Sequence, residues 1–327
     1  MKKILIIQTA FTGDVILATA LIDSIRSAFP DVRLDVLVRK GNESLLENNP
    51  AIRKILVWDK RIKKFRHLVE ILHIIRAEKY TDVINLQRFA SSGLLTVFSG
   101  AKITSGFNKN PFSLLFTHRV PHIIGNGKHE TERNQELIHY FMTGPAGKPR
   151  LYPSLEDVNK VSSFKAQEYI CIAPGSVWFT KTFPKSKWVE FIRHSAEKYP
   201  GRTIYLLGSP AEEELCNQII SESSCKKAVN LSGKLSFLES AALMKDAKMN
   251  FVNDSAPLHI ASAMNAPVTA IYCSTIPAFG FGPLSVQSRI VETKEKLSCR
   301  PCGLHGLKTC PKKHFRCATE IEIHQLD

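Results

Sequence analysis

The feature that most constrains this fold is an alternation of short apolar runs and amphipathic helical patterns. In the first half, helical patterns such as "VILATALIDSIRSAF" separate the strand patterns, which cover residues 2–8, 33–39, 54–59 and 81–87. Short strands that alternate with helices indicate a parallel sheet with crossover helices. The first half is therefore expected to be an α/β domain.

The same alternation begins again near residue 169. Strand patterns recur at residues 169–175, 203–209, 228–233, 249–254 and 267–274, with helical patterns between them. Glycine and proline punctuate residues 100–155 heavily, which places a linker within residues 145–160. We therefore expect two Rossmann-like domains, residues 1–155 and 156–327, that face each other across a cleft where ligands bind.

The positive charge lies mainly in the first half of the chain. The net charge is +14, with 23 Lys and Arg against 13 Asp and Glu in residues 1–150, and 21 against 17 in the remainder. Such an excess favours an anionic partner: nucleic acid, an anionic membrane surface or an acidic substrate. A solvated surface of mixed charge is the alternative. No apolar run is long enough to span a membrane, and the N-terminus lacks a signal-peptide pattern, so a cytoplasmic protein is expected.

Polar residues at strand-to-helix junctions are the candidates for chemistry, because ligands bind at the carboxyl ends of parallel strands. The stretch "FVNDSAPLHIASA" is one such junction, and it places Asp254 and Ser255 before a helix. The helix start offers unpaired backbone N–H groups to a phosphate, while Asp254 offers oxygens to ligand hydroxyls. The alternative is that Asp254 or Ser255 only caps the helix.

A second junction, "PGSVWFTKTFPKSKW", follows the strand pattern at residues 169–173 and carries Ser176 and Lys181. A lysine supplies a mobile positive charge suited to a diphosphate, although it is equally an ordinary solvated lysine. The helix that follows is expected to be capped by Ser186. Ser176 and Lys181 share a sheet edge with Asp254, which favours an anion site there.

The third junction, "QTAFTGDVILATA", lies in the first domain and contains Gly13 but no dinucleotide-binding GxGxxG pattern. Its carboxylate, Asp14, is either a helix cap or a residue that takes a proton from an incoming hydroxyl.

Four cysteines crowd the C-terminus. Cys299 and Cys302 form a CxxC pair, and Cys310 and Cys317 follow. Zinc binding, disulfides and free packed thiols are all open on this spacing.

The assembled segments resemble glycosyltransferase family 9, the heptosyltransferases of lipopolysaccharide core assembly. The likeness covers both domains and is carried by four segments and a cysteine-bearing tail: "ILIIQTAFTGDVILATALIDSIR", "APGSVWFTKTFPKSKW", "LLGSPAEEE", "NDSAPLHIASAMNAPVTAIY" and "CRPCGLHGLKTCPKKHFRC". The tail is similar to that of the heptosyltransferase II group.

The resemblance implies a GT-B fold and an inverting transfer of heptose from ADP-heptose to a lipid A inner-core acceptor, with no cofactor or metal required. It implies that Asp14 is the general base and that Lys181 neutralises the leaving diphosphate. Asp254 would hold sugar hydroxyls. The other positions matched to donor binding are Gly13, Ser176, Glu212, Leu235, Ser255, Ala256 and His259. For Glu212 a helix-capping role explains the residue equally well.

The acceptor that the resemblance implies bears phosphates and carboxylates. Its candidate contacts are Arg61, Lys63, Lys64 and Arg88. The implied protein is a monomer that binds no nucleic acid and lies in the cytoplasm, peripheral to the inner face of the inner membrane.

Three alternatives stay open. The chain could use another nucleotide sugar, or it could be similar to sugar-nucleotide epimerases, which need further carboxylates in the cleft. A nucleic-acid-binding protein is the distant alternative, although the basic residues lack the interleaved aromatics of RNA-binding surfaces.

Overall fold

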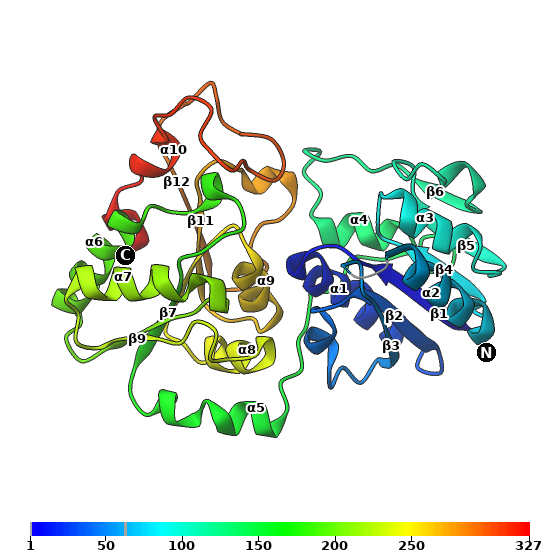
Figure 1. Cartoon of the computed structure of the whole chain (residues 1–327), viewed down its shortest axis with the longest axis horizontal. Helices are drawn as coiled ribbons and strands as arrows, with labels where there is room; N and C mark the ends of the chain where they lie inside the picture. Colours follow the sequence, from blue (N-terminus) through cyan, green and yellow to red (C-terminus); the bar gives the residue numbers. More distant parts are fainter. Residues whose placement is uncertain (1, 62–63) are drawn as a thin grey trace. The chain divides into compact units, whose positions relative to one another are not determined.

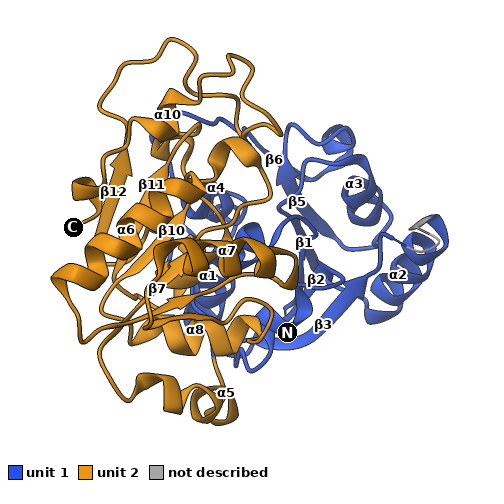
Figure 2. Cartoon of the chain, turned by 60° about the vertical axis from the view of Figure 1, so that its left-hand side comes forward, with its two compact units in different colours: residues 1–152 blue, residues 153–327 orange. Residues whose placement is uncertain are grey.

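The computed structural model describes residues 2–61 and 64–327. It consists of two compact units, residues 1–152 and 153–327 (Figures 1 and 2). The division lies within the expected linker at residues 145–160.

Unit 1 is built on a parallel six-stranded sheet with the order β3-β2-β1-β4-β5-β6. The strands are β1 (Lys3–Gln8), β2 (Arg33–Arg39), β3 (Ile52–Trp58), β4 (Asp82–Asn85), β5 (Ile103–Phe107) and β6 (His118–Val120). The helices are α1 (Thr12–Ala28), α2 (Lys64–Glu78), α3 (Ala90–Val97) and α4 (Glu130–Glu136), with 3-10 turns η1 (Glu43–Leu46) and η2 (Ser113–Leu115).

Helices cover both faces of this sheet, as the apolar strand patterns require. Leu5 and Ile7 of β1 join the buried cluster that contains Ile71 and Ile75 of α2. Strand side chains alternate between faces, so the equally buried Ile4 and Ile6 point the other way. Helix α1 contacts β1, β2 and α4, whereas α2 contacts α3.

Unit 2 repeats the plan with the strand order β12-β11-β10-β7-β8-β9, again all parallel. The strands are β7 (Tyr169–Ala173), β8 (Thr203–Leu206), β9 (Ala228–Asn230), β10 (Asn250–Asn253), β11 (Val268–Tyr272) and β12 (Ser288–Glu292). The helices are α5 (Leu155–Lys160), α6 (Lys185–Lys198), α7 (Glu213–Ser223), α8 (Phe237–Lys245), α9 (Ala256–Ala263) and α10 (Arg316–Thr319). The 3-10 turns are η3 (Ser162–Lys165), η4 (Phe179–Lys181), η5 (Pro210–Glu212), η6 (Pro277–Phe279) and η7 (Ile323–Leu326). The α/β fold class predicted from the sequence is confirmed.

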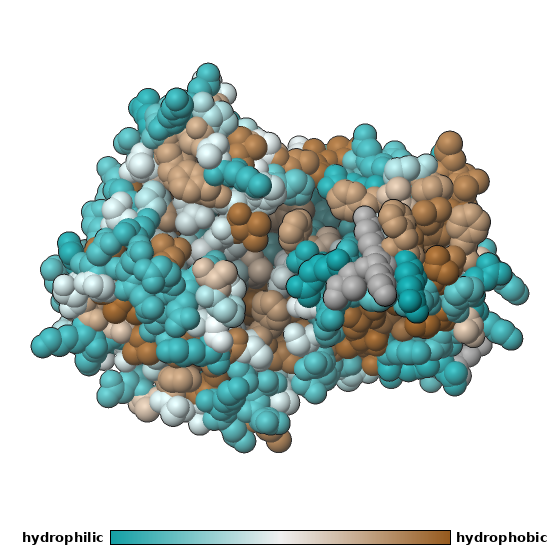
Figure 3. Space-filling model, in the orientation of Figure 1, coloured by the Kyte–Doolittle hydropathy of each residue, from teal (hydrophilic) through white to brown (hydrophobic). Residues whose placement is uncertain are grey.

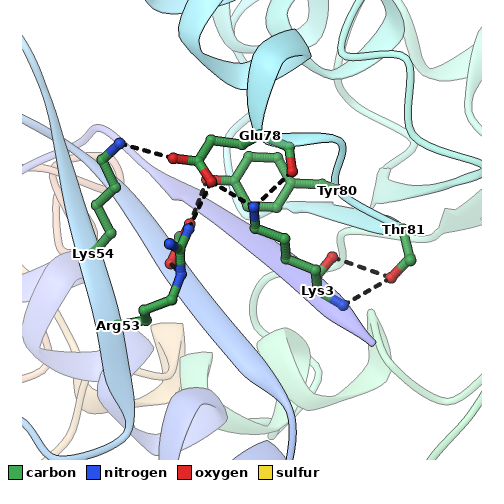
Figure 4. Close-up of polar contacts among 7 residues, drawn as sticks. Lys3, Arg53, Lys54, Glu78, Tyr80 and Thr81 are labelled. Atoms are coloured by element: carbon green, nitrogen blue, oxygen red, sulfur yellow. Dashed lines mark hydrogen bonds and ion pairs between the residues drawn. The ribbon is translucent and has the colours of Figure 1, made fainter. Parts of the chain in front are cut away.

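A charged network ties the amino edge of the first sheet to α2 (Figure 4). Glu78, the last residue of α2, accepts from Lys3, from Arg53 at 2.8 Å and from Lys54 at 2.8 Å. The buried Asp35 accepts from Tyr80 Oη at 2.6 Å and from Arg53. The bonds that Glu78 accepts, led by that of Lys3, lower its pKa to about 2. The network lies at the end of the sheet opposite the strand-to-helix junctions, so it stabilises the fold and leaves the carboxyl edge for chemistry.

No helix of the described chain is both long enough and apolar enough to span a membrane.

Candidate functional site

The β1–α1 loop brings Asp14 to the carboxyl edge of the first sheet. Helix α1 begins at Thr12, so Gly13 and Asp14 lie in its first turn. The residue at the cap position is Phe11, which makes no side-chain capping bond. The alternative in which Asp14 caps the helix is therefore wrong. A carboxylate in the first turn is stabilised by the helix dipole instead.

Two side chains from neighbouring loops fix this loop in place. The buried Asn42 donates to Ala10 O at 3.0 Å and accepts from Thr12 Oγ1 at 3.1 Å. Lys60 Nζ donates to Thr9 O at 2.8 Å and to Thr9 Oγ1 at 2.9 Å. The backbone that presents Asp14 is thus held on both sides.

Asp14 lies among charged side chains of unit 1. Burial lowers the pKa of Arg39, and the carboxylate of Asp14 opposes that shift. Burial also raises the pKa of Glu130 to about 7; the ion pair with Arg133 lowers it, and Asp14 raises it further. Arg133 Nε donates to Glu130 Oε2 at 2.8 Å. The base expected from the sequence therefore lies close to a buried carboxyl group that the sequence reasoning missed.

Three of the residues proposed for the acceptor, Arg61, Lys64 and Arg88, follow strands at the same edge. Arg61 is exposed after β3, and its backbone N–H donates to Asp59 Oδ1 at 2.9 Å. Lys63 lies outside the described residues, and Lys64 begins α2. Arg88 follows β4 and is half-buried. Burial lowers the pKa of His122 to about 4, and Arg88 is the first of the cations that lower it further.

In unit 2 the structure brings Lys181 and Asp254 together. Lys181 ends η4, Asp254 follows β10, and Lys181 Nζ lies 2.8 Å from Asp254 Oδ2. Thr275 Oγ1 donates to the same oxygen at 2.6 Å. Lys181 and Thr275 thus contact the same oxygen of this carboxylate, Oδ2.

Buried polar side chains fix this pair. Asn253 Oδ1 accepts from Phe183 N at 2.9 Å, and its Nδ2 donates to Pro174 O at 2.8 Å, so it joins β10 to the segment after β7. Arg300 donates to Thr275 O at 2.8 Å and to Cys273 O at 2.7 Å. The segment after β11, which carries Thr275, is thereby held in place.

The C-terminal segment packs directly on the lysine turn. Thr180 N donates to Leu307 O at 3.1 Å, and Leu307 N donates to Thr180 Oγ1 at 2.7 Å. Gly306 has a φ of +76°, and a Cβ at this position would lie 2.8 Å from Lys181 Cγ. Only glycine fits between the tail and Lys181 without displacing that side chain.

Glu212 forms a capping box with Ser209 and also contacts the segment that follows β7. Its Oε2 accepts from Ser209 N at 2.7 Å and from Ser209 Oγ at 2.9 Å, as the sequence predicted. A side chain at Gly175 would overlap with the Glu212 carboxylate. Ser176 follows Gly175, so Glu212 and Ser176 share this corner of the edge.

The remaining donor candidates surround the start of α9. Ser255 is the residue before the helix, but its side chain makes no capping bond, so the capping alternative is wrong for Ser255. Ala256 is the first helical residue, and His259 lies buried one turn further. Leu235 lies half-buried before α8. The first N–H groups of a helix have no partner within it, so the start of α9 can receive an anion.

The four C-terminal cysteines are free thiols. Burial raises the pKa of Cys317 to about 11, and the neighbouring Cys302, Cys310 and Cys299 raise it further. Cys299 Sγ lies 3.7 Å from His314 Nε2. In residues 2–61 and 64–327, no group of three His, Cys, Asp or Glu side chains is arranged to hold a metal ion.

Sequence reasoning missed Thr275, Glu130 and Gly306. Thr275 follows a strand of the same sheet, so the rule that ligands bind at the carboxyl ends of parallel strands could have identified it. The buried Glu130–Arg133 pair is spaced as i,i+3 on a short helix, a spacing that also occurs in solvated pairs. Nothing in the sequence around Gly306 indicates that it lies against Lys181.

The fold of this chain is similar to the folds of solved glycosyltransferases. The structure of Escherichia coli ADP-heptose lipopolysaccharide heptosyltransferase II is similar to this one with a TM-score of 0.80, at 20% identity over 100% of this chain and 96% of that one. E. coli heptosyltransferase WaaC with ADP-2-deoxy-2-fluoro heptose gives a TM-score of 0.73, at 19% identity over 89% and 93%. The fold is that of GT-B glycosyltransferases.

The sequence then gives the family. The profile described as "Glycosyltransferase family 9 (heptosyltransferase)" matches residues 68–309. Lipopolysaccharide heptosyltransferase 3 of E. coli is 27% identical over 81% of this chain and 82% of its own length. This chain belongs to glycosyltransferase family 9, which confirms the resemblance carried by the four segments and makes the protein a glycosyltransferase.

Proposed function

We propose that this protein transfers heptose from ADP-heptose to a hydroxyl group of the lipopolysaccharide inner core, with inversion at the anomeric carbon. The observation that carries the proposal is the Lys181–Asp254–Thr275 cluster at the start of α9, in a member of the heptosyltransferase family. It combines a cation for a diphosphate with a carboxylate for sugar hydroxyls.

The donor is assigned to unit 2. The start of α9, at Ser255 and Ala256, receives the phosphates, and Lys181 neutralises the charge that develops on the departing ADP. Such groups stabilise the transition state more than the ground state, because the negative charge appears as the glycosyl–phosphate bond breaks. Asp254 Oδ1 accepts from a heptose hydroxyl, while Ser176, Glu212, Leu235 and His259 surround the nucleoside.

The acceptor is assigned to unit 1. Asp14 takes the proton of the attacking hydroxyl, whose oxygen then bonds to the anomeric carbon. Gly13 lets the substrates approach this turn. Arg61, Lys63, Lys64 and Arg88 contact acceptor phosphates and carboxylates. With Lys181 in place of a divalent cation, the reaction is proposed to need no metal.

The protein is further proposed to work as a monomer in the cytoplasm, at the inner face of the inner membrane. A lipid-anchored acceptor and the positive charge of residues 1–150 support that location.

The test is transfer by the purified protein from ADP-heptose to truncated core acceptors in the presence of EDTA. Asp14→Asn should abolish transfer while ADP still binds, and the exposed Asp31→Asn serves as the matched control. Normal turnover by Asp14→Asn would show that another group is the base. Activity with a different nucleotide sugar, and none with ADP-heptose, would refute the proposed donor.

A further inference from the structure

An apolar surface lies at the carboxyl edge of the first sheet, over its β4–β5–β6 half. It consists of four side chains that follow these strands: Phe89, 63% exposed; Leu114, 79%; Leu115, 63%; and Ile123, 56%. The strands are adjacent and parallel, so the segments after them emerge side by side. Figure 3 shows apolar side chains gathered on the right of the view, around the position of α3.

Two of these segments are joined rigidly. The buried Asn110 donates to Phe89 O at 3.0 Å and to Gln87 O at 3.0 Å, and its Oδ1 accepts from Phe112 N at 3.0 Å. Asn110 thus fixes the start of α3 against the turn that carries Leu114 and Leu115. The leucines are held in an outward position, with little conformational freedom to lose on binding.

The charged side chains of the segment that carries this surface have one sign. Between Asp82 and Glu130 the chain has no Asp or Glu but five Lys or Arg. Arg88 directly precedes Phe89, and the exposed Lys109 precedes the two leucines. Apolar tips on a segment that carries cations and no acid are complementary to an anionic bilayer, whose headgroups attract the cations while its acyl region receives the apolar side chains.

We propose that Phe89, Leu114, Leu115 and Ile123 insert into an anionic membrane and that Lys109 contacts its headgroups. This inference rests on the proposed function in one respect: a lipid-anchored acceptor then reaches Asp14 from the bilayer. The surface and Asp14 belong to the same edge of the same sheet, so one docked orientation serves both.

The test is flotation with vesicles of phosphatidylcholine alone or mixed with phosphatidylglycerol, without donor or acceptor. The wild-type protein should bind the mixed vesicles, and binding should weaken as salt is added. The Leu114→Ser/Leu115→Ser variant should bind at least about tenfold more weakly, because two apolar side chains no longer leave water. Lys109→Gln should lose about fivefold on mixed vesicles only.

Leu155→Ser is the matched control, since Leu155 is 83% exposed but lies in unit 2. It should bind like the wild type, and thermal melting should show that all variants fold. Wild-type protein that ignores mixed vesicles would overturn the proposal, and so would equal binding by the double leucine variant.

Activity separates this inference from the proposed function. The double leucine variant should transfer heptose to a deacylated, soluble acceptor like the wild type, but poorly to the same acceptor in vesicles. If the wild type binds vesicles as described yet transfers to neither acceptor, the membrane surface stands and the proposed function fails.

Discussion

Replacement of Lys181 by methionine tests whether this lysine binds the donor diphosphate. Its Nζ lies 2.8 Å from Asp254 Oδ2, and the side chain is only 14% exposed. An ammonium group has three donors, so one bond to Asp254 leaves two for phosphate oxygens. Methionine keeps the length of the side chain and removes the charge.

The expected loss of ADP affinity is about 30-fold. A hydrogen bond to a charged group contributes about 1.5–3 kcal/mol, and about 2 kcal/mol corresponds to that factor in Kd. AMP lacks the β-phosphate, so its affinity should fall much less. The variant also removes the cation paired with the buried Asp254, whose bond from Thr275 stays, and this should destabilise unit 2 by about 2 kcal/mol, less than for a fully buried pair.

A double variant separates these effects. Lys181→Met/Asp254→Asn removes the unpaired charge, so it should recover stability without recovering ADP affinity. Calorimetry with ADP and AMP in EDTA measures affinity, and denaturant unfolding measures stability. Lys185→Met is the control, since Lys185 pairs with Glu222 at the surface of the same unit. Unchanged ADP affinity, or equal losses for ADP and AMP, would refute the assignment.

Two further predictions concern groups around the site. Gly306→Ala should lower ADP affinity about tenfold, because the added Cβ displaces Lys181. Gly303 has a similar φ of +70° but no atom within 4 Å of an added Cβ, so Gly303→Ala should lower only the stability, by about 1 kcal/mol of backbone strain. Equal ADP affinities of the two variants in calorimetry would contradict this prediction. Burial raises the pKa of Glu130 to about 7, so its contribution to stability is complete below pH 4.5 and is lost as pH rises through 7. The free energy of unfolding of the wild type relative to Glu130→Gln should therefore fall by about 2 kcal/mol between pH 5 and pH 8 in urea titrations, and a constant difference would show that Glu130 does not titrate in this range.

The sequence was sufficient for elements that carry their own local signal. The apolar runs of β1 and β7 are continuous because both faces of each sheet are covered. The Ser-x-x-Glu patterns that begin at Ser209 and Ser236 form the capping boxes that such a pattern indicates. β5 and β6 were not recognised, because β5 reads Ile-Thr-Ser-Gly-Phe and β6 has only three residues. These two strands form because they pair with neighbours in the sheet, and a local sequence pattern carries no information about such pairing.

The start of α6 was predicted wrongly. Ser186 was expected to cap α6, but the helix begins one residue earlier, at Lys185, and the residue before it is Pro184. A proline fixes its own φ and starts the helix without any side-chain bond, so the serine next to it was misleading.

The site itself depended on contacts that sequence spacing does not encode. The positions of Lys181 and Asp254 after parallel strands predicted that they share one edge of the sheet, but not that they form a direct ion pair. Gly306, more than a hundred residues after Lys181, became relevant only through the missing space for its Cβ.

The ion pair also explains why a donor site would contain a carboxylate beside the cation meant for phosphates. Left alone, a flexible lysine would lose rotamer freedom when a diphosphate arrived, and that loss would weaken binding. Asp254 Oδ2 holds Nζ in position beforehand, and Thr275 fixes the same oxygen, so the carboxylate cannot rotate toward the phosphates. In the proposed donor complex, Oδ1 of the same carboxylate accepts from a sugar hydroxyl. A single acid can then position the cation and recognise the transferred group, which predicts that Asp254→Asn weakens selection among sugars more than it weakens binding of ADP.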